Sequence, residues 1–252
     1  MATEKGDHAK AWRALLPREH GLWGWLLVPL LCAIALAPGL AVFGAALATV
    51  AGFGAANALG RSHRLTEPAI LTALGIAAAG AALAVVTAVV PVTMGLVLAI
   101  AGALGLGARM LARGRIPRQR PLELLALTGL SVSAAIIAVG DGAAPARAAA
   151  ALTAVLAWLV LGLWWVGALL ARVLKHRPPS ASLPWVAASA VVSSGVVGVA
   201  TQHPIVGALP ILYMGRIVAH RPPAHARDAW RVGVAELAWG VALALAAGLV
   251  NG

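Results

Sequence analysis

The sequence has few charged residues and a single cysteine, and each shortage excludes a class of protein. Only 11% of the residues are charged, whereas a water-soluble domain carries about 25%. The hydrophobic share of 61% excludes an intrinsically disordered chain. Because Cys32 is the only cysteine, a scaffold held together by disulfides is excluded as well. The composition therefore predicts an all-α, polytopic transmembrane helical bundle.

Acidic residues are scarcer than basic ones, and the net charge is +11. In a soluble protein this surplus would suggest nucleic acid as a partner, but membrane proteins gather basic residues in cytoplasmic loops. We therefore expect membrane lipids and no nucleic acid as partners. Residues 1–20 are polar and mixed in charge, so we expect no cleavable signal peptide there. We expect them to form a cytoplasmic segment ahead of one transmembrane domain over residues 21–252.

Nine apolar stretches are candidates to cross a bilayer, which takes roughly 17–25 residues. The weakest is 204–219, which contains Pro204, Pro210 and Arg216 and is expected to be a short or kinked helix. A turn signal at residues 37–39 separates the first two stretches, and Val90-Pro91 separates the third from the fourth. The predicted spans are 21–37, 40–59, 68–89, 92–108, 122–140, 148–171, 184–200, 204–219 and 232–250.

The positions of lysine and arginine predict how these spans are oriented. With the N-terminus in the cytoplasm, 18 of the 19 basic residues fall on the cytoplasmic side, and only Arg147 falls outside. Removing one span would break this alternation. The pattern predicts nine helices in the inner membrane, with the N-terminus cytoplasmic and the C-terminus periplasmic.

The glutamates follow the same order, which supplies a structural explanation for most charges near the spans. Glu19, Glu67, Glu123 and Glu236 lie in or beside the cytoplasmic starts of spans one, three, five and nine. A carboxylate there complements the positive end of a helix dipole. Arginines such as Arg216 meet the negative ends of the helices that finish on the same side.

The start of the first span carries the most distinctive group of polar residues. Arg18, Glu19 and His20 precede Trp23 where the chain enters the bilayer. Histidine titrates near neutral pH, and a neighbouring carboxylate raises its pKa. These residues are candidates for a functional site, with a helix-start motif as the alternative.

Three further candidates lie inside other spans. Glu236 is five residues past Arg231, about 7.5 Å along a helix, and ionisable residues at such depth are functional candidates by default. The alternative is an interfacial acid that reaches back to the cytoplasm. Glu123 occupies an ordinary helix-start position after Pro121, and Asn57 is suited to a hydrogen bond between helices.

The segment Pro17-Arg18-Glu19-His20-Gly21-Leu22-Trp23 resembles the opening of the YwiC-like family of bacterial integral membrane proteins. Residues 121–125, Trp165-Val166 and residues 231–236 resemble later parts of that family more loosely. Leu22 departs from the small residue that the family usually has there. The resemblance implies a membrane topology, and it implies no assigned activity.

The nine-helix arrangement also resembles that of UbiA-type intramembrane prenyltransferases, in which aspartates at the cytoplasmic ends of spans two and six bind Mg²⁺. Here Asn57 stands at the corresponding end of span two, but no aspartate follows it, and span six ends with basic residues. Because Mg²⁺ needs carboxylate ligands, we predict no metal and no cofactor. The alternatives left open are a diverged UbiA-like enzyme or lipid-binding protein, a small-molecule transporter, and a component that binds an unidentified membrane partner or lipid-like ligand.

Overall fold

The computed structural model describes residues 20–62, 68–87, 119–175, 183–219 and 229–249. Within these ranges every residue lies in a helix or in a short turn, and none lies in a strand, which confirms the all-α prediction for this part of the chain. The helices are α2 (His20–Leu36), α3 (Leu40–Ser62), α4 (Pro68–Thr87), α6 (Gln119–Gly140), α7 (Pro145–Lys175), α8 (Leu183–Ala200), α9 (Pro204–Ala219) and α10 (Ala229–Leu249). They match eight of the nine predicted spans, and the stretch 92–108 lies outside the described residues.

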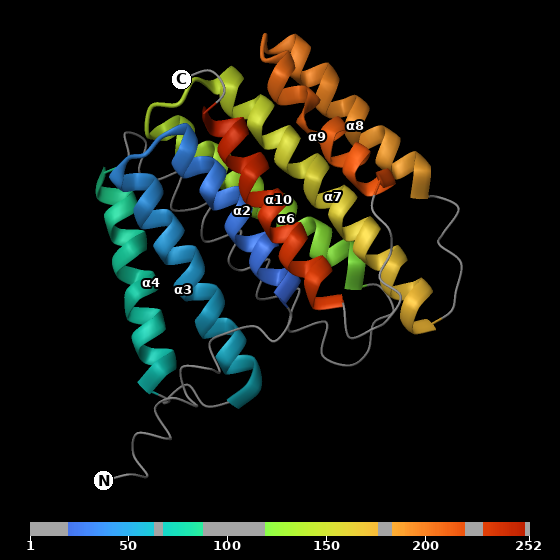
Figure 1. Ribbon diagram of the computed structural model, residues 1–252. Coiled ribbons are helices and arrows are strands. Elements are labelled where there is room, and N and C mark those ends of the chain that lie inside the picture. Colours follow the sequence, from blue (N-terminus) through green and yellow to red (C-terminus); the bar gives the residue numbers. More distant parts are fainter. Residues whose placement is uncertain (1–19, 63–67, 88–118, 176–182, 220–228, 250–252) are drawn as a thin grey trace.

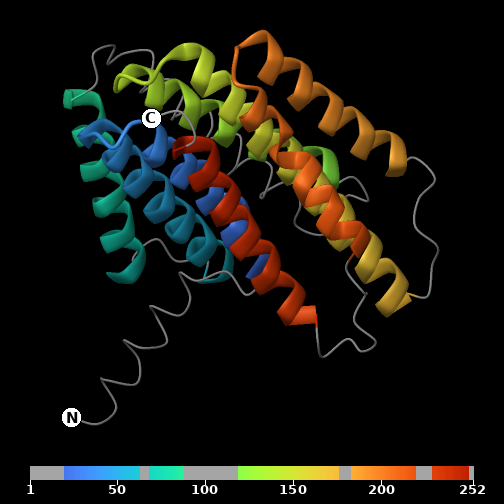
Figure 2. The same ribbon diagram turned by 45° about the horizontal axis from the view of Figure 1, so that its top comes forward.

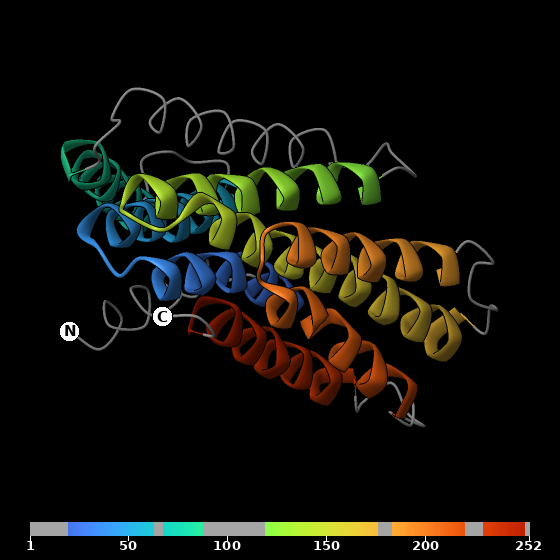
Figure 3. The same ribbon diagram turned by 90° about the horizontal axis from the view of Figure 1, so that it is seen from above.

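The long helix α7 occupies the middle of the arrangement and contacts α2, α6, α8, α9 and α10 (Figures 1 and 3). The hairpin of α8 and α9 flanks one side of it, and the pair of α3 and α4 lies on the opposite side of the bundle (Figure 2). The main core lies between α2, α7, α9 and α10, where Val28, Trp158, Tyr213 and Ala244 are buried.

Three short turns join neighbouring helices at the same end of the bundle, the upper end in Figure 1. They comprise residues 37–39, 141–144 and 201–203. Two of these turns end the preceding helix in the same way. Gly142 and Gln202 have positive φ angles of 107° and 62°, and the amide of the residue after each donates to the carbonyl five residues before that amide. This left-handed C-cap satisfies helix-end carbonyls and reverses the chain, so the joined helices run antiparallel.

The two ends of the bundle differ in charge. Of the seven lysines and arginines in the described ranges, Arg147 alone lies at the end with the short turns. Its Nη2 donates to the Gly248 carbonyl in the last turn of α10, where a cation complements the helix dipole. At the same end the Asp141 carboxylate accepts a bond of 3.3 Å from the Val42 amide in the first turn of α3. The opposite end carries Arg61, Arg120, Arg172, Lys175, Arg216 and Arg231, and we call it the basic end.

Helix α4 has no charged residue and exposes apolar side chains over most of its circumference. Its buried residues, which include Ile70, Ala73 and Gly80, lie on the one face that packs on α3. Leu71 and Val86 are 55% and 83% exposed. By length and composition, three helical stretches are suited to crossing a membrane: Pro68–Thr87, Pro145–Val166 and Arg231–Leu249. The other apolar helices among the described residues are shorter by this measure.

Glycine brings the backbones of α3 and α4 into contact. A Cβ atom added at Gly80 would lie 2.6 Å from the Gly44 carbonyl oxygen and 2.8 Å from the Ala48 amide nitrogen. Both atoms belong to the backbone, so a side chain at Gly80 would force the two helices apart. Small residues commonly allow such close approach between helices whose association gains little from the hydrophobic effect.

We predict that Gly80→Leu lowers stability by about 1–3 kcal/mol, because the larger side chain overpacks the α3–α4 contact. This corresponds to a decrease in Tm of several degrees, measured by circular dichroism of the detergent-solubilised protein. Gly75→Leu on the same helix is the matched control, since a Cβ at Gly75 meets nothing within 4 Å. Equal Tm values for the two variants would contradict the close approach.

Candidate functional site

A buried carboxylate, Glu236 in α10, lies at the centre of a polar cluster. Glu236 is 8% exposed and is the one charged residue among the buried residues that the structure describes. Its Oε2 accepts a hydrogen bond from the Tyr213 hydroxyl, and its Oε1 pairs with Nη1 of Arg216. The side chains of Glu236 and Arg216 are each 11% exposed, so the ion pair is largely shielded from water.

The helical repeat places these groups on facing sides of α9 and α10. Tyr213 and Arg216 are three residues apart on α9, and Glu236 and Trp239 are three residues apart on α10, so each pair lies on one helix face. The guanidinium carbon of Arg216 lies 5.6 Å from the centre of the Tyr213 ring and 5.8 Å from that of Trp239. Both rings therefore attract the cation through their π faces.

Helix α7 forms the third wall of the cluster. The Trp158 ring meets Tyr213 edge-on, with centroids 6.4 Å apart and an interplanar angle of 65°. Gly162 has no side chain, and a Cβ there would lie 3.5 Å from the Tyr213 hydroxyl oxygen and 4.0 Å from Glu236 Oε2. Trp158 is 2% exposed, and its indole Nε1 has no hydrogen-bond partner among the described residues. We refer to Trp158, Tyr213, Arg216, Glu236 and Trp239 as the Glu236 cluster.

The cluster lies inside the bundle, near its basic end. Arg216 is in the last turn of α9, where its charge also complements the helix dipole. Glu236 is seven residues past the first residue of α10, about 10 Å along the helix axis. Its carboxylate is thus buried and paired within the bundle, and it does not reach back to the helix end. A charged pair held here interacts strongly because little water screens it.

The structure places the other predicted site residues only in part. His20 is the first residue of α2, Trp23 follows one turn later, Asn57 lies near the end of α3, and Glu123 lies near the start of α6. All four positions are towards the basic end of the bundle, but their side chains are outside the described part of the structure. Arg18 and Glu19 lie outside the described residues altogether.

Sequence reasoning missed three members of the cluster, Trp158, Tyr213 and Trp239, and assigned a fourth a different role. Arg216 was expected only as a partner of the helix dipole. One signal was present: Tyr213 is the only tyrosine in the chain and stands three residues before an arginine on a predicted span. The pairing of that helix face with Glu236 depends on how α9 and α10 are rotated, and the sequence pattern does not report this rotation.

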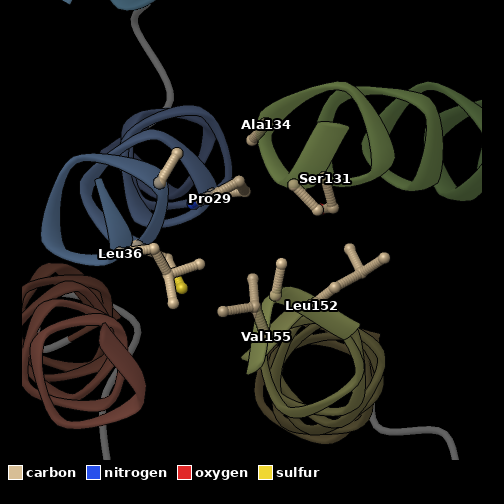
Figure 4. Close-up of a pocket in the computed structure, with 10 residues that line it drawn as sticks. Pro29, Leu36, Ser131, Ala134, Leu152 and Val155 are labelled. Carbon is tan, nitrogen blue, oxygen red and sulfur yellow. The ribbon is translucent and has the colours of Figure 1, made fainter. Parts of the chain in front are cut away.

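A separate apolar pocket lies between α2, α6 and α7 (Figure 4). Pro29, Leu36, Leu152 and Val155 line it, together with the hydroxyl-bearing Ser131. It has room for about one water molecule, which is far less than a substrate pocket needs. No member of the Glu236 cluster lines it.

Carboxylate and imidazole groups do not gather into a metal site in the described ranges. No group of three or more histidine, cysteine, aspartate and glutamate residues lies close enough there to hold a metal ion. The Glu236 cluster itself contributes a single carboxylate, which is opposed by a guanidinium. Its chemistry is therefore that of a charge-assisted hydrogen-bond network.

We predict that Arg216→Gln lowers the free energy of unfolding by about 3–5 kcal/mol, because it leaves the Glu236 carboxylate buried without a counter-ion. The double variant Arg216→Gln/Glu236→Gln carries no buried charge and should recover most of the lost stability. Thermal unfolding of the native protein, both single variants and the double variant in detergent measures the coupling. Strictly additive losses would show that the two side chains do not interact.

Comparisons of the chain with protein-family models, with curated proteins and with solved structures found no match.

Proposed function

We propose that this chain is a multi-pass protein of the inner membrane whose functional site is the Glu236 cluster, at the cytoplasmic face. The outer surface of α4 carries this proposal. A 20-residue helix without a charged residue exposes Leu71, Leu74, Ile76 and Val86. Soluble monomers rarely expose apolar patches of more than a few hundred Å². Exposing such a surface to lipid carries no free-energy cost, whereas exposing it to water does.

Exposed apolar residues also occur on the far side of the bundle, and this distribution favours lipid over a partner protein. Helix α8 exposes Val192, Val196 and Val199, and α9 exposes Leu212 and Val218. These helices flank α7 on the side away from α3 and α4 (Figure 2). A single protein partner would cover one face, whereas a bilayer surrounds all of them.

The charge difference between the two ends supports the orientation. Six of the seven described basic residues lie at the basic end, and loops rich in lysine and arginine stay in the cytoplasm. Trp185, 77% exposed near the start of α8, lies at the same end, where tryptophan is typical of the membrane boundary. We therefore place the basic end and the N-terminus in the cytoplasm and the C-terminus in the periplasm. Residues 92–108 supply the ninth span in this proposal.

The proposed relationship to the YwiC-like family is based on the segment 17–23 and on Gly233-x-x-Glu236 near the start of α10. The second segment supplies the carboxylate at the centre of the cluster. One carboxylate opposed by an arginine is a poor donor set for Mg²⁺. This chemistry supports binding of a ligand by a diverged relative of the UbiA-type fold more than metal-dependent prenyl transfer.

Single-cysteine labelling tests the orientation. In a Cys32→Ala background, a membrane-impermeant maleimide added to intact cells should label Gln202→Cys, which is an exposed position at the α8–α9 turn. Lys175→Cys, at the end of α7, should react only after the membrane is opened. Native Cys32, 4% exposed, is the control that reacts in neither case. Labelling of Lys175→Cys in intact cells would contradict the proposed orientation.

A further inference from the structure

We propose that the Glu236 cluster is a phosphate-binding site, in which the oxyanion of a ligand replaces the Glu236 carboxylate on Arg216. This inference rests on the proposed function, because that function places the cluster at the cytoplasmic face of the membrane. The ligand is a terminal phosphate group, carried either by a lipid or by a soluble molecule. Between binding events, Glu236 occupies the position of the phosphate.

The contacts of Glu236 show that its hold on Arg216 is incomplete. Only Oε1 pairs with the guanidinium, through Nη1, while Oε2 accepts the Tyr213 hydroxyl. The arrangement differs from the two-pronged contact that arginine and carboxylate form at their strongest. A phosphate offers three or more acceptor oxygens to the same guanidinium and satisfies its planar fork of donors better than one carboxylate oxygen does.

A second donor in the cluster is not satisfied by Glu236. The indole Nε1 of Trp158, whose ring meets Tyr213, is buried and has no partner among the described residues; Nε1 of Trp164, outside the cluster, is in the same state. Buried donors are normally paired, and each exception calls for an explanation. A phosphate provides the acceptor oxygens that the single carboxylate of the cluster lacks.

The side chains around the pair and the charge of this end of the bundle favour the exchange. Because residue 162 is a glycine, no side chain of α7 stands beside the Tyr213 hydroxyl and Glu236 Oε2, where a Cβ would lie 3.5 Å and 4.0 Å away. The rings of Tyr213 and Trp239 hold the guanidinium in place when Glu236 departs. The basic residues at this end of the bundle attract an anion approaching from the cytoplasm.

The test measures phosphate binding as a rise in Tm, since a ligand that binds only the folded state stabilises it in proportion to its occupancy. Full-length protein in phosphatidylcholine nanodiscs is titrated with sodium phosphate, with sodium chloride keeping the ionic strength constant. We expect Glu236→Gln to bind phosphate about tenfold more tightly than the native protein, because the carboxylate that competes for Arg216 is removed. A tenfold change in affinity corresponds to about 1.4 kcal/mol. Arg216→Gln and Arg216→Gln/Glu236→Gln should show no phosphate-dependent rise.

A second arm identifies the source of the phosphate. The same proteins are placed in nanodiscs in which phosphatidic acid replaces part of the phosphatidylcholine, with no free phosphate added. A rise in Tm with phosphatidic acid alone supports a lipid ligand, and a rise with inorganic phosphate alone supports a soluble one. In either case the rise in Tm must be largest for Glu236→Gln, smaller for the native protein and absent for Arg216→Gln to support the proposal.

An equal response of the native protein and all variants, or no response in any of them, would overturn the phosphate site and leave the pair a structural contact. The double variant keeps this outcome readable if Arg216→Gln alone fails to fold, because it carries no uncompensated buried charge. Cysteine labelling reports the orientation independently of binding. A reversed orientation with the expected order of affinities would overturn the proposed function but not the binding site.

Discussion

The shortage of polar side chains on the outer surface is the constraint from which the rest of the architecture follows. Helices satisfy their own backbone hydrogen bonds, so a helix such as α4 can expose an apolar surface and remain stable where water is absent. In lipid, association of helices gains little from the hydrophobic effect and depends on close packing. In the proposed lipid surroundings, this accounts for the backbone contact of α3 with α4 at Gly44 and Gly80, and of α8 with α9 at Gly198 and Gly207.

The same constraint confines most charged residues to the two ends of the bundle. At the end with the short turns, Asp141 and Arg147 are used to cap α3 and α10. The remaining described basic residues lie at the other end, where the proposed orientation places the cytoplasm. Against this background Glu236 is the exception, because a buried carboxylate is costly unless a counter-ion and hydrogen-bond donors accompany it. Arg216 and Tyr213 supply both. Only one carboxylate oxygen of Glu236 contacts the guanidinium, and the proposed phosphate site depends on this single contact.

The fold could be predicted from the sequence more fully than the site. The stretch 204–219 coincides with α9 because Pro204 suits the first position of a helix. The predicted span 148–171 is shorter than α7 (Pro145–Lys175), because that helix continues into polar residues that hydropathy does not count. Glu236 was identifiable as an acid within a span. Its pairing with Tyr213 and Arg216, 23 and 20 residues earlier, depends on helix rotation and packing, which only the three-dimensional structure shows.

The lipid exposure of α4 is tested most directly by spin labels placed one at a time along residues 70–86 of the reconstituted protein, with accessibility to oxygen and to a water-soluble nickel chelate measured at each site. Oxygen partitions into lipid and the chelate stays in water. The account predicts that oxygen access exceeds chelate access at Leu71, Leu74 and Val86, and that both are lowest at the buried positions Ala73 and Ala84. Higher chelate access at the exposed positions would place α4 in water and contradict the account.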